Sequence, residues 1–362
     1  MAEPVIVFNN GSGSDTIASG AGPGTPVNGT GAAHTNGASS TTITLTNSPD
    51  LSAVATDGSA AIWLATASGR RWSKITGVDD GADTVTTEDS FNIASGSAVD
   101  YGIGGKRKTL DSSRELLGGD IKDEWAVELE DDQTVTTSAI SIDVERYSIG
   151  SSVVGTERTI TQSANAAVFD FSSGTDQVVV HVLKFQNSNG TKSSAYGVIA
   201  TTGGSSFEMR FERCTFGDSV NTLNQAFDGT CRQMMLCDCE ILDCTGPGID
   251  ITNTNVGIIG CSVHDNGSAG IQIANRSYTI LDSLVYGNGG DGLTVKAQPQ
   301  ETLIVKNCPI RDNTGDGIDF TSSSAGGEAP VVISCNITAN GGYGVRGDWS
   351  SSHTSAGFLD WC

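Results

Sequence analysis

Two aspartates are the first candidates for chemistry in this sequence. Asp291 and Asp316 lie in matching Gly-Asp-Gly triplets, 25 residues apart. If the fold sets the triplets side by side, the carboxylates lie about 5 Å apart, which suits a shared Ca²⁺ ion or a retaining glycosidase. However, Gly-Asp-Gly is ordinary turn chemistry, and turns that face solvent accept aspartate freely, so turn structure is the favoured interpretation. We predict a candidate calcium site at this pair and assign no catalytic residue.

Thiols are the second candidate. Cysteines recur at intervals of 22 to 27 residues, with Ser283 in the one gap: Cys214, Cys239, Cys261, Cys308 and Cys335. Such a column could hold metal ions or a ladder of disulfides. An apolar residue follows two positions after every member, so the column faces the same way as a hydrophobic row, where a free cysteine packs as a small hydrophobe. The sequence favours a packing column.

A denser thiol cluster raises zinc as an alternative. The paired C-x₂-C spacing of a zinc ribbon is missing from its members, which are Cys231, Cys237, Cys239 and Cys244. Zinc is therefore the weaker interpretation. We expect no cofactor, with calcium at the aspartate pair as the one exception.

These positions belong to a repeat that begins at Gln177. Apolar and polar residues alternate around each cysteine, which indicates strands with one buried face. Asparagine recurs five residues after the cysteine position, and glycine nine residues after it: Asn266, Asn288, Asn313, Asn340, then Gly248, Gly270, Gly292, Gly317, Gly344. A second strand follows each late glycine, as in Ile249-Asp250-Ile251. Repeats of this length, each contacting mainly its neighbours, indicate a solenoid.

The repeat resembles that of the right-handed parallel β-helix, or pectin-lyase-like, superfamily, with its inward asparagine ladder and stacked aliphatic columns. The resemblance covers residues 177 to about 347 and extends back to about Asp111. It implies an all-β fold, a single-stranded parallel β-helix preceded by a small β-rich domain and an N-terminal arm. It implies no particular chemistry, because this fold carries many functions.

The repeat also predicts which outward side chains can meet. Asp250 and Asp319 fall three coils apart, about 14 Å, which is too far for a glycosidase pair. Asp265 and Asp312 fall two coils apart, near about 10 Å, at the outer edge of the inverting range. One outward column could bind a sugar ring or a carboxylate, although such ladders are more often solvated faces: His264, Tyr286 and Arg311.

Composition excludes several partners. The net charge of −22 argues against nucleic acid and anionic membranes, because phosphate binding needs clustered Lys and Arg. No apolar run approaches ~20 residues, so no transmembrane segment is expected. The first residues lack the basic and apolar regions of a secretory signal, and nine cysteines fit a reducing compartment. We expect synthesis in a host cytoplasm without a signal peptide.

Three regions follow one another along the chain. Residues 1–40 are rich in Gly, Ala, Ser and Thr, and we predict a docking arm there. Residues 41–110 hold short alternating segments between turns, which favours a small β barrel or sandwich. Residues 111–362 are predicted as the β-helix, with a short helix over Asp111–Gly118 that caps its N-terminal end.

This layout resembles surface proteins of tailed-phage virions. The resemblance implies a structural virion protein (a capsid decoration, head fibre or tail-spike component) that docks on other virion proteins through its N-terminal region. It also implies a homotrimer and contact with host polysaccharide. The alternative is a β-helix polysaccharide lyase or glycoside hydrolase, a depolymerase; a bacterial adhesin is a third hypothesis. The sequence lacks the Asp-Pro-His-Glu pattern of alginate epimerases and a recognisable polygalacturonase motif set, which disfavours an enzyme.

Overall fold

Contacts between residues divide the protein into two compact units, Met1–Thr134 with Ser141–Arg158, and Val135–Ile140 with Thr159–Cys362. The structure is a computed structural model. It describes residues 5–8, 27–33, 40–45, 51–52, 54, 56, 61–66, 69–90, 98–104, 106–107, 124–129, 132–136, 139–142, 146–151, 156–171, 177–200, 208–252, 254–274, 277–295, 303–320, 331–347 and 358–360. Within these ranges the secondary structure is all β. No helix long and apolar enough to cross a bilayer occurs in them.

The first unit contains a closed antiparallel barrel, in the order β2-β3-β6-β5-β4-β7. Buried and half-buried residues alternate in Thr42–Leu45 and in Thr84–Thr87, and Ile43, Ile75 and Val85 have no exposed surface. This barrel confirms the predicted small β domain. Its strands are β2 (Val27–Ala33), β3 (Thr42–Leu45), β4 (Ala61–Thr66), β5 (Gly69–Asp79), β6 (Thr84–Thr87) and β7 (Ala98–Gly104).

Four further strands of this unit pair in parallel, in the order β8-β1-β9-β12. They are β1 (Val5–Phe8), β8 (Lys106–Arg107), β9 (Glu124–Leu129) and β12 (Arg146–Ser151). Strands β1 and β2 come from the segment expected to be a docking arm, so parts of that segment are strands. The helix predicted over Asp111–Gly118 lies outside the described residues, and the boundaries 1–40, 41–110 and 111–362 stay predictions.

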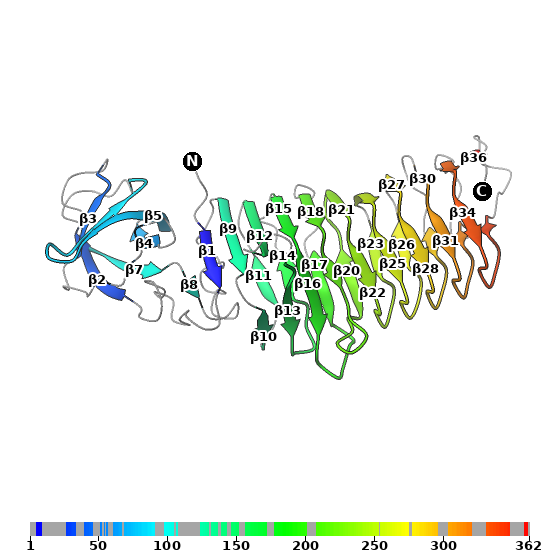
Figure 1. Cartoon of the computed structure of the whole chain (residues 1–362), viewed down its shortest axis with the longest axis horizontal. Coiled ribbons are helices and arrows are strands. Elements are labelled where there is room, and N and C mark those ends of the chain that lie inside the picture. The colour runs from blue at the N-terminus through cyan, green and yellow to red at the C-terminus, as the bar shows by residue number, and fades with distance from the viewer. Residues whose placement is uncertain are drawn as a thin grey trace. The chain divides into compact units, whose positions relative to one another are not determined.

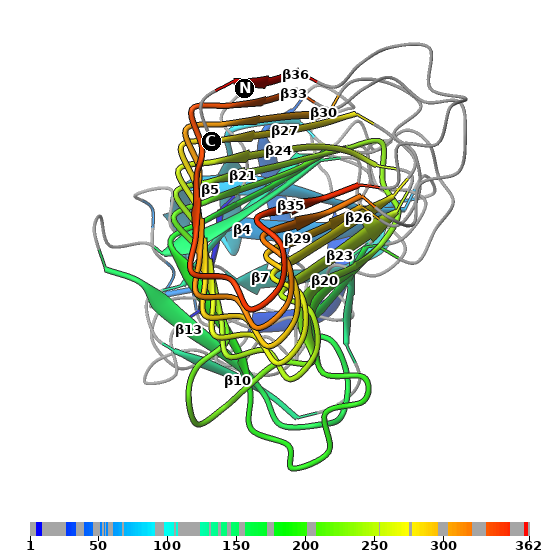
Figure 2. The same ribbon diagram turned by 90° about the vertical axis from the view of Figure 1, so that its right-hand side faces the viewer.

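The second unit is a parallel solenoid of three sheets, whose strands stack coil upon coil in Figure 1. Seen along the stacking direction in Figure 2, the sheets form three sides of each coil. Two short strands, β10 (Gln133–Val135) and β11 (Ile140–Ile142), lie where the two units divide. This solenoid confirms the predicted parallel β-helix.

We number the sheets in the order in which each coil visits them from β15 onward. Sheet 1 contains β15 (Gln177–His181), β18 (Glu208–Glu212), β21 (Gln233–Cys237), β24 (Asn255–Ile259), β27 (Tyr278–Leu281), β30 (Leu303–Lys306), β33 (Val331–Ile333) and β36 (Phe358–Asp360). Sheet 2 contains β13 (Arg158–Gln162), β16 (Leu183–Asn187), β19 (Thr215–Phe216), β22 (Glu240–Leu242), β25 (Ser262–His264), β28 (Leu284–Tyr286), β31 (Pro309–Arg311) and β34 (Asn336–Thr338). Sheet 3 contains β14 (Phe169–Phe171), β17 (Tyr196–Ala200), β20 (Gln225–Gly229), β23 (Ile249–Thr252), β26 (Ile271–Ala274), β29 (Leu293–Val295), β32 (Ile318–Asp319) and β35 (Val345–Arg346).

Left-handed residues bend the chain at both ends of sheet 2. The residue directly before each cysteine position has a positive φ, for example 52° at Asp238 and 50° at Asp282. A second bend of the same kind follows sheet 2, with φ 55° at Asp265 and 57° at Asp312. Aspartate and asparagine tolerate this conformation better than most residues. Many acidic residues of the repeat are therefore explained by backbone geometry.

The core is a set of stacked rows, one residue per coil. The Phe185 and Phe216 rings stack with centroids 4.7 Å apart. At the bend after sheet 2, asparagine side chains form the predicted ladder: the Asn266 amide donates to Asn288 Oδ1 at 2.9 Å, and the Asn288 amide donates to Asn313 Oδ1 at 2.8 Å. Because Asn288 has no exposed surface, these bonds form away from solvent.

Candidate functional site

The cysteine column lies inside the solenoid, where sheet 1 bends into sheet 2. Its members are at most 3% exposed. Each thiol donates to a main-chain carbonyl, as Cys239 Sγ does to Cys237 O at 3.3 Å, and Ser283 Oγ does the same to Leu281 O at 2.7 Å. A small donor therefore fits every position of the column, and the predicted packing role is confirmed.

Of the neighbouring cysteines, Cys231 and Cys244 are also core residues, whereas Cys237 is half-buried. Cys244 stands one coil before the asparagine ladder, and its backbone N–H donates to Asn266 Oδ1 at 3.0 Å. Burial raises the pKa of the Cys231 thiol to about 12. A thiol that stays protonated at neutral pH is a poor nucleophile and a poor metal ligand. All cysteines in the described part of the chain are free thiols.

The structure brings the predicted pair Asp291 and Asp316 together in adjacent coils. Asp291 Oδ1 accepts a hydrogen bond from the backbone N–H of Asp316 at 2.8 Å. Asp291 Oδ2 accepts another from Thr294 Oγ1 at 2.9 Å. The first carboxylate therefore caps the turn of the next coil.

Asp316 repeats this arrangement one coil later. Its Oδ1 accepts from the backbone N–H of Tyr343 at 2.6 Å, and its Oδ2 lies 3.6 Å from Arg346 Nη1. A Cβ atom at Gly315 or at Gly342 would collide with the carboxylate beneath it, so glycine before each turn leaves room for the aspartate. This geometry favours a turn-capping ladder for the pair. The calcium site stays a prediction.

The second acidic pair does not converge. Asp265 Oδ2 lies 2.9 Å from Nδ1 of its neighbour His264, and Asp312 forms an ion pair with its neighbour Arg311. Both aspartates occupy left-handed bends, which accounts for the residue type. Each of these carboxylates therefore has a partner on its own coil.

The outward column on sheet 2 forms a closed stack. The rings of His264 and Tyr286 are nearly parallel, at 10°, with centroids 4.6 Å apart. On the next coil, the Arg311 guanidinium lies 5.0 Å from the Tyr286 ring centroid. Tyr286 is thus covered on both faces by its neighbours, so neither face of its ring is free to stack on a sugar.

Sequence reasoning missed one acidic pair, Asp228 and Asp250. Asp228 on β20 and Asp250 on β23 lie opposite each other in the register of these two strands. Both side chains point outward and are half-buried. Adjacent coils place them about 5 Å apart. Burial, reinforced by the charge of Asp250, raises the pKa of Asp228. The pair was missed because the coil of Asp228 lacks the late glycine before its strand; the alignment of Phe227 with Ile249 is the signal that would have found it.

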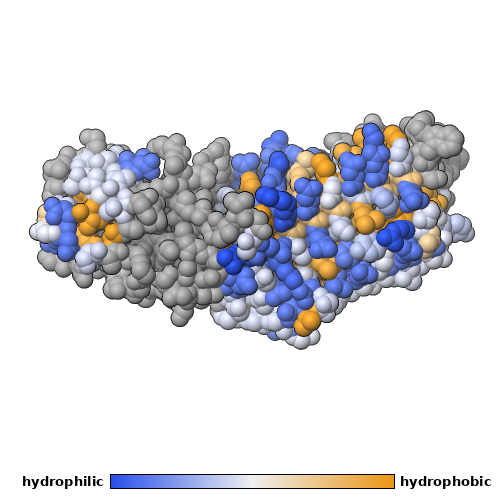
Figure 3. Space-filling view, viewed as in Figure 1, coloured by the Kyte–Doolittle hydropathy of each residue, from blue (hydrophilic) through white to orange (hydrophobic). Residues whose placement is uncertain are grey.

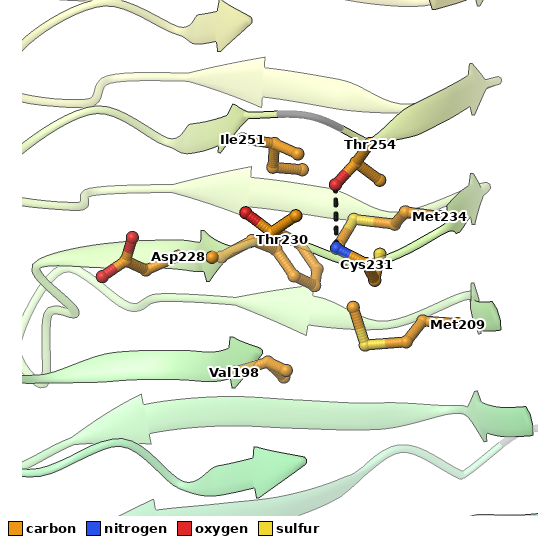
Figure 4. Close-up of a pocket in the computed structure, with 10 residues that line it drawn as sticks. Val198, Met209, Asp228, Thr230, Cys231, Met234, Ile251 and Thr254 are labelled. Carbon is orange, nitrogen blue, oxygen red and sulfur yellow. Dashed lines mark hydrogen bonds between the residues drawn. The ribbon is translucent and has the colours of Figure 1, made fainter. Parts of the chain in front are cut away.

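A shallow hollow lies beside Asp228. Figure 4 shows the Asp228 carboxylate at one side of it, away from Cys231, Met234 and Thr254, and the dashed line marks the bond of 3.0 Å from the Cys231 N–H to Thr254 Oγ1. The hollow has no room for a water molecule, and its walls are mainly apolar. It is a packing gap between coils.

Among the residues that the structure describes, no group of three or more His, Cys, Asp or Glu side chains is arranged so that it could hold a metal ion.

The stacked rows, the asparagine ladder and the three parallel sheets all point to one family. A family model described as the right-handed β-helix region matches residues 171–357. The chain belongs to the right-handed β-helix family. No curated protein and no solved structure matches the chain.

Membership of the right-handed β-helix family shows the fold and leaves the chemistry to the individual site. In this β-helix protein, the side chains that suggested chemistry in the sequence mostly bond within their own coil or to the next coil. The adjacent carboxylates Asp228 and Asp250 are the arrangement that most resembles catalytic machinery.

Proposed function

We propose that this protein is a structural component of a tailed-phage virion surface, such as a capsid decoration, a head fibre or a tail spike. The observation that carries the proposal is the use of Asp291 and Asp316 as caps for the next coil. Polar rows that bond coil to coil suit a rigid surface element better than a site of turnover. The phage assignment itself rests on the resemblance of the chain's layout to virion surface proteins.

Antibodies against the purified full chain test this role. We expect them to label intact phage particles in lysates of the culture that carries the gene, and we expect mass spectrometry of those particles to give a fixed copy number. Hundreds of copies indicate a capsid decoration, and a few to tens indicate a tail or vertex component. Protein found free in the lysate, with none on purified particles, contradicts the proposal.

A depolymerase is the second candidate, and the Asp228–Asp250 pair favours it. Two carboxylates about 5 Å apart match the spacing of a retaining glycosidase. The raised pKa of Asp228 suits an acid that protonates the leaving group, while Asp250 would act as the nucleophile. Gln272 donates to Asp250 Oδ2 at 3.4 Å and would hold that carboxylate in place.

Activity on a panel of bacterial surface polysaccharides separates the two functions. A depolymerase shortens at least one polymer, and Asp228→Asn or Asp250→Asn lowers the rate by at least about 10²-fold. Asp170→Asn is the matched control, because Asp170 lies in the same outward row with Ile199 between it and Asp228. The structural function predicts no cleavage by any of the four proteins.

A further inference from the structure

Four asparagines of the second unit directly precede a glycine: Asn189, Asn266, Asn288 and Asn340. In such a pair the asparagine side chain can react with its own backbone. The glycine nitrogen attacks the side-chain carbonyl carbon and closes a succinimide ring, and the side-chain nitrogen leaves as ammonia with the amide proton. Water then opens the ring to aspartate or isoaspartate. Glycine favours the attack because it has no Cβ to crowd the nitrogen.

Three of these pairs belong to the asparagine ladder, where hydrogen bonds between coils hold both reacting groups. The N–H of each glycine donates to a carbonyl of the preceding coil at 2.7 or 2.8 Å: Gly267 to Cys244, Gly289 to Asn266, and Gly341 to Asn313. The side-chain amides also bond to a neighbouring coil, as the Asn340 amide does to Ile310 O at 3.1 Å. The reaction in the ladder therefore requires a coil to open first.

The fourth pair lies outside the ladder, in the connection 188–195 between β16 and β17. This connection is longer than 265–270, which joins β25 to β26 in a regular coil. Gly190 is exposed, and its N–H donates no hydrogen bond to any residue that the structure describes. In Figure 3, the lowest part of the solenoid, where Figure 1 draws green loops, is mainly white and blue rather than orange. Water therefore reaches the reacting nitrogen without any opening of the coils.

The side chain of Asn189 is folded over its own connection. Its Oδ1 accepts a hydrogen bond from the N–H of Thr191 at 2.8 Å, and this Asx turn encloses the intervening nitrogen of Gly190. The same N–H stabilises the negative charge that develops on Oδ1 when the carbonyl is attacked, as a donor in an oxyanion hole does. The departing Nδ2 gives up one hydrogen bond, to Ser163 O at 3.0 Å.

We propose that Asn189 is a site of spontaneous covalent modification, at which the side chain deamidates to aspartate and isoaspartate, while the ladder protects its own asparagines. The product carries an additional negative charge and lacks the Nδ2 donor to Ser163 O. Isoaspartate also lengthens the main chain by one atom, which disrupts the turn at Thr191. The change is confined to one connection and leaves the stack of coils intact. The inference does not depend on the virion role, because the reaction needs only water.

Peptide mapping by mass spectrometry tests the assignment, with the folded full chain and its tryptic peptides both incubated at pH 8 and 37 °C. In the peptides the four asparagines should react at similar rates, because each precedes glycine. In the folded chain Asn189 should stay within about 10-fold of its peptide rate, whereas Asn288 should react at least about 100-fold more slowly than in its peptide. Asn340 separates exposure from hydrogen bonding, since the N–H of the exposed Gly341 is bonded. It should react more slowly than Asn189.

A substitution at the reacting nitrogen tests the mechanism. Gly190→Ala should slow the modification of Asn189 at least about 10-fold, because the new Cβ crowds the nitrogen. The fold accepts this change, since no atom lies within 4 Å of a Cβ at Gly190. Ser188→Ala, in the same connection, is the matched control and should leave the rate unchanged. An unmodified Asn189 in the folded chain, a ladder asparagine that reacts as fast, or an unchanged rate in Gly190→Ala overturns the proposal.

Discussion

The buried thiols make the stability of the solenoid depend on pH. Burial raises the pKa of Cys231 to about 12, and a hydrogen bond with the Cys214 thiol, followed by burial, raises that of Cys239 to about 12. Because a folded-state pKa above the unfolded value favours the protonated native form, each thiol stabilises the fold fully below about pH 8.5. That contribution is lost as the pH rises from there towards 12.

Urea unfolding at pH 8 and at pH 10.5 should therefore show a loss of about 2 kcal/mol for each such thiol. The Cys231→Ser variant should lose about 2 kcal/mol less than the wild type over the same interval. Cys237→Ser is the control, because Cys237 is half-buried and its replacement should change the alkaline loss less. An unchanged alkaline loss in Cys231→Ser would show that this thiol is not buried in the folded protein.

At the scale of elements, the ladders between coils hold the three sheets in register. Asn288 donates to Asn313 and accepts from both the side chain and the backbone of Asn266. Its removal leaves buried partners on two coils without their bonds. The ladder is therefore a point where one substitution affects several strands.

Asn288→Ala should lower the free energy of unfolding by about 2–4 kcal/mol. The exposed Asn336 on β34 offers the matched substitution, and Asn336→Ala should change it by less than about 0.5 kcal/mol. Urea denaturation monitored by circular dichroism measures both. Similar losses of unfolding free energy in the two variants would show that the asparagine ladder does not stabilise the stack of coils.

The regular coils could be predicted from the sequence, whereas the irregular ones could not. Cys261, Asn266 and Gly270 recur at fixed offsets, so the inward column, the ladder and the late glycine were all correctly placed. Asp228 was missed because its coil lacks the glycine that marks the third strand. Strand β1 pairs with β9, far along the chain, and its four residues carry no sign of that partner.

The same limit applies to the candidate site. Spacing placed Asp291 and Asp316 in adjacent coils, as the structure has them. It could not show that each carboxylate accepts a hydrogen bond from the backbone of the next coil, because that depends on turn geometry. Likewise, it placed His264, Tyr286 and Arg311 in one column without showing that they cover one another.

At the scale of the whole molecule, polar rows such as the asparagine ladder bond the coils of the solenoid to one another. A structural surface protein has little need of a bound metal or a reactive thiol. In this interpretation, Asp291 and Asp316, the acidic residues before the late glycines, stabilise the stack by capping the next coil. The calcium prediction for Asp291 and Asp316 is the competing interpretation of the same residues.

The most direct measurement is the melting temperature of the wild type and of Asp316→Ala, each in EDTA and in CaCl₂. We expect the wild type to have the same melting temperature in both solutions. In both solutions we expect Asp316→Ala to melt at a lower temperature. Its free energy of unfolding should fall by about 1–3 kcal/mol, because the Tyr343 N–H and Arg346 lose their acceptor. A rise in the wild-type melting temperature with CaCl₂ that disappears in Asp316→Ala would contradict this expectation and establish the aspartates as a calcium site.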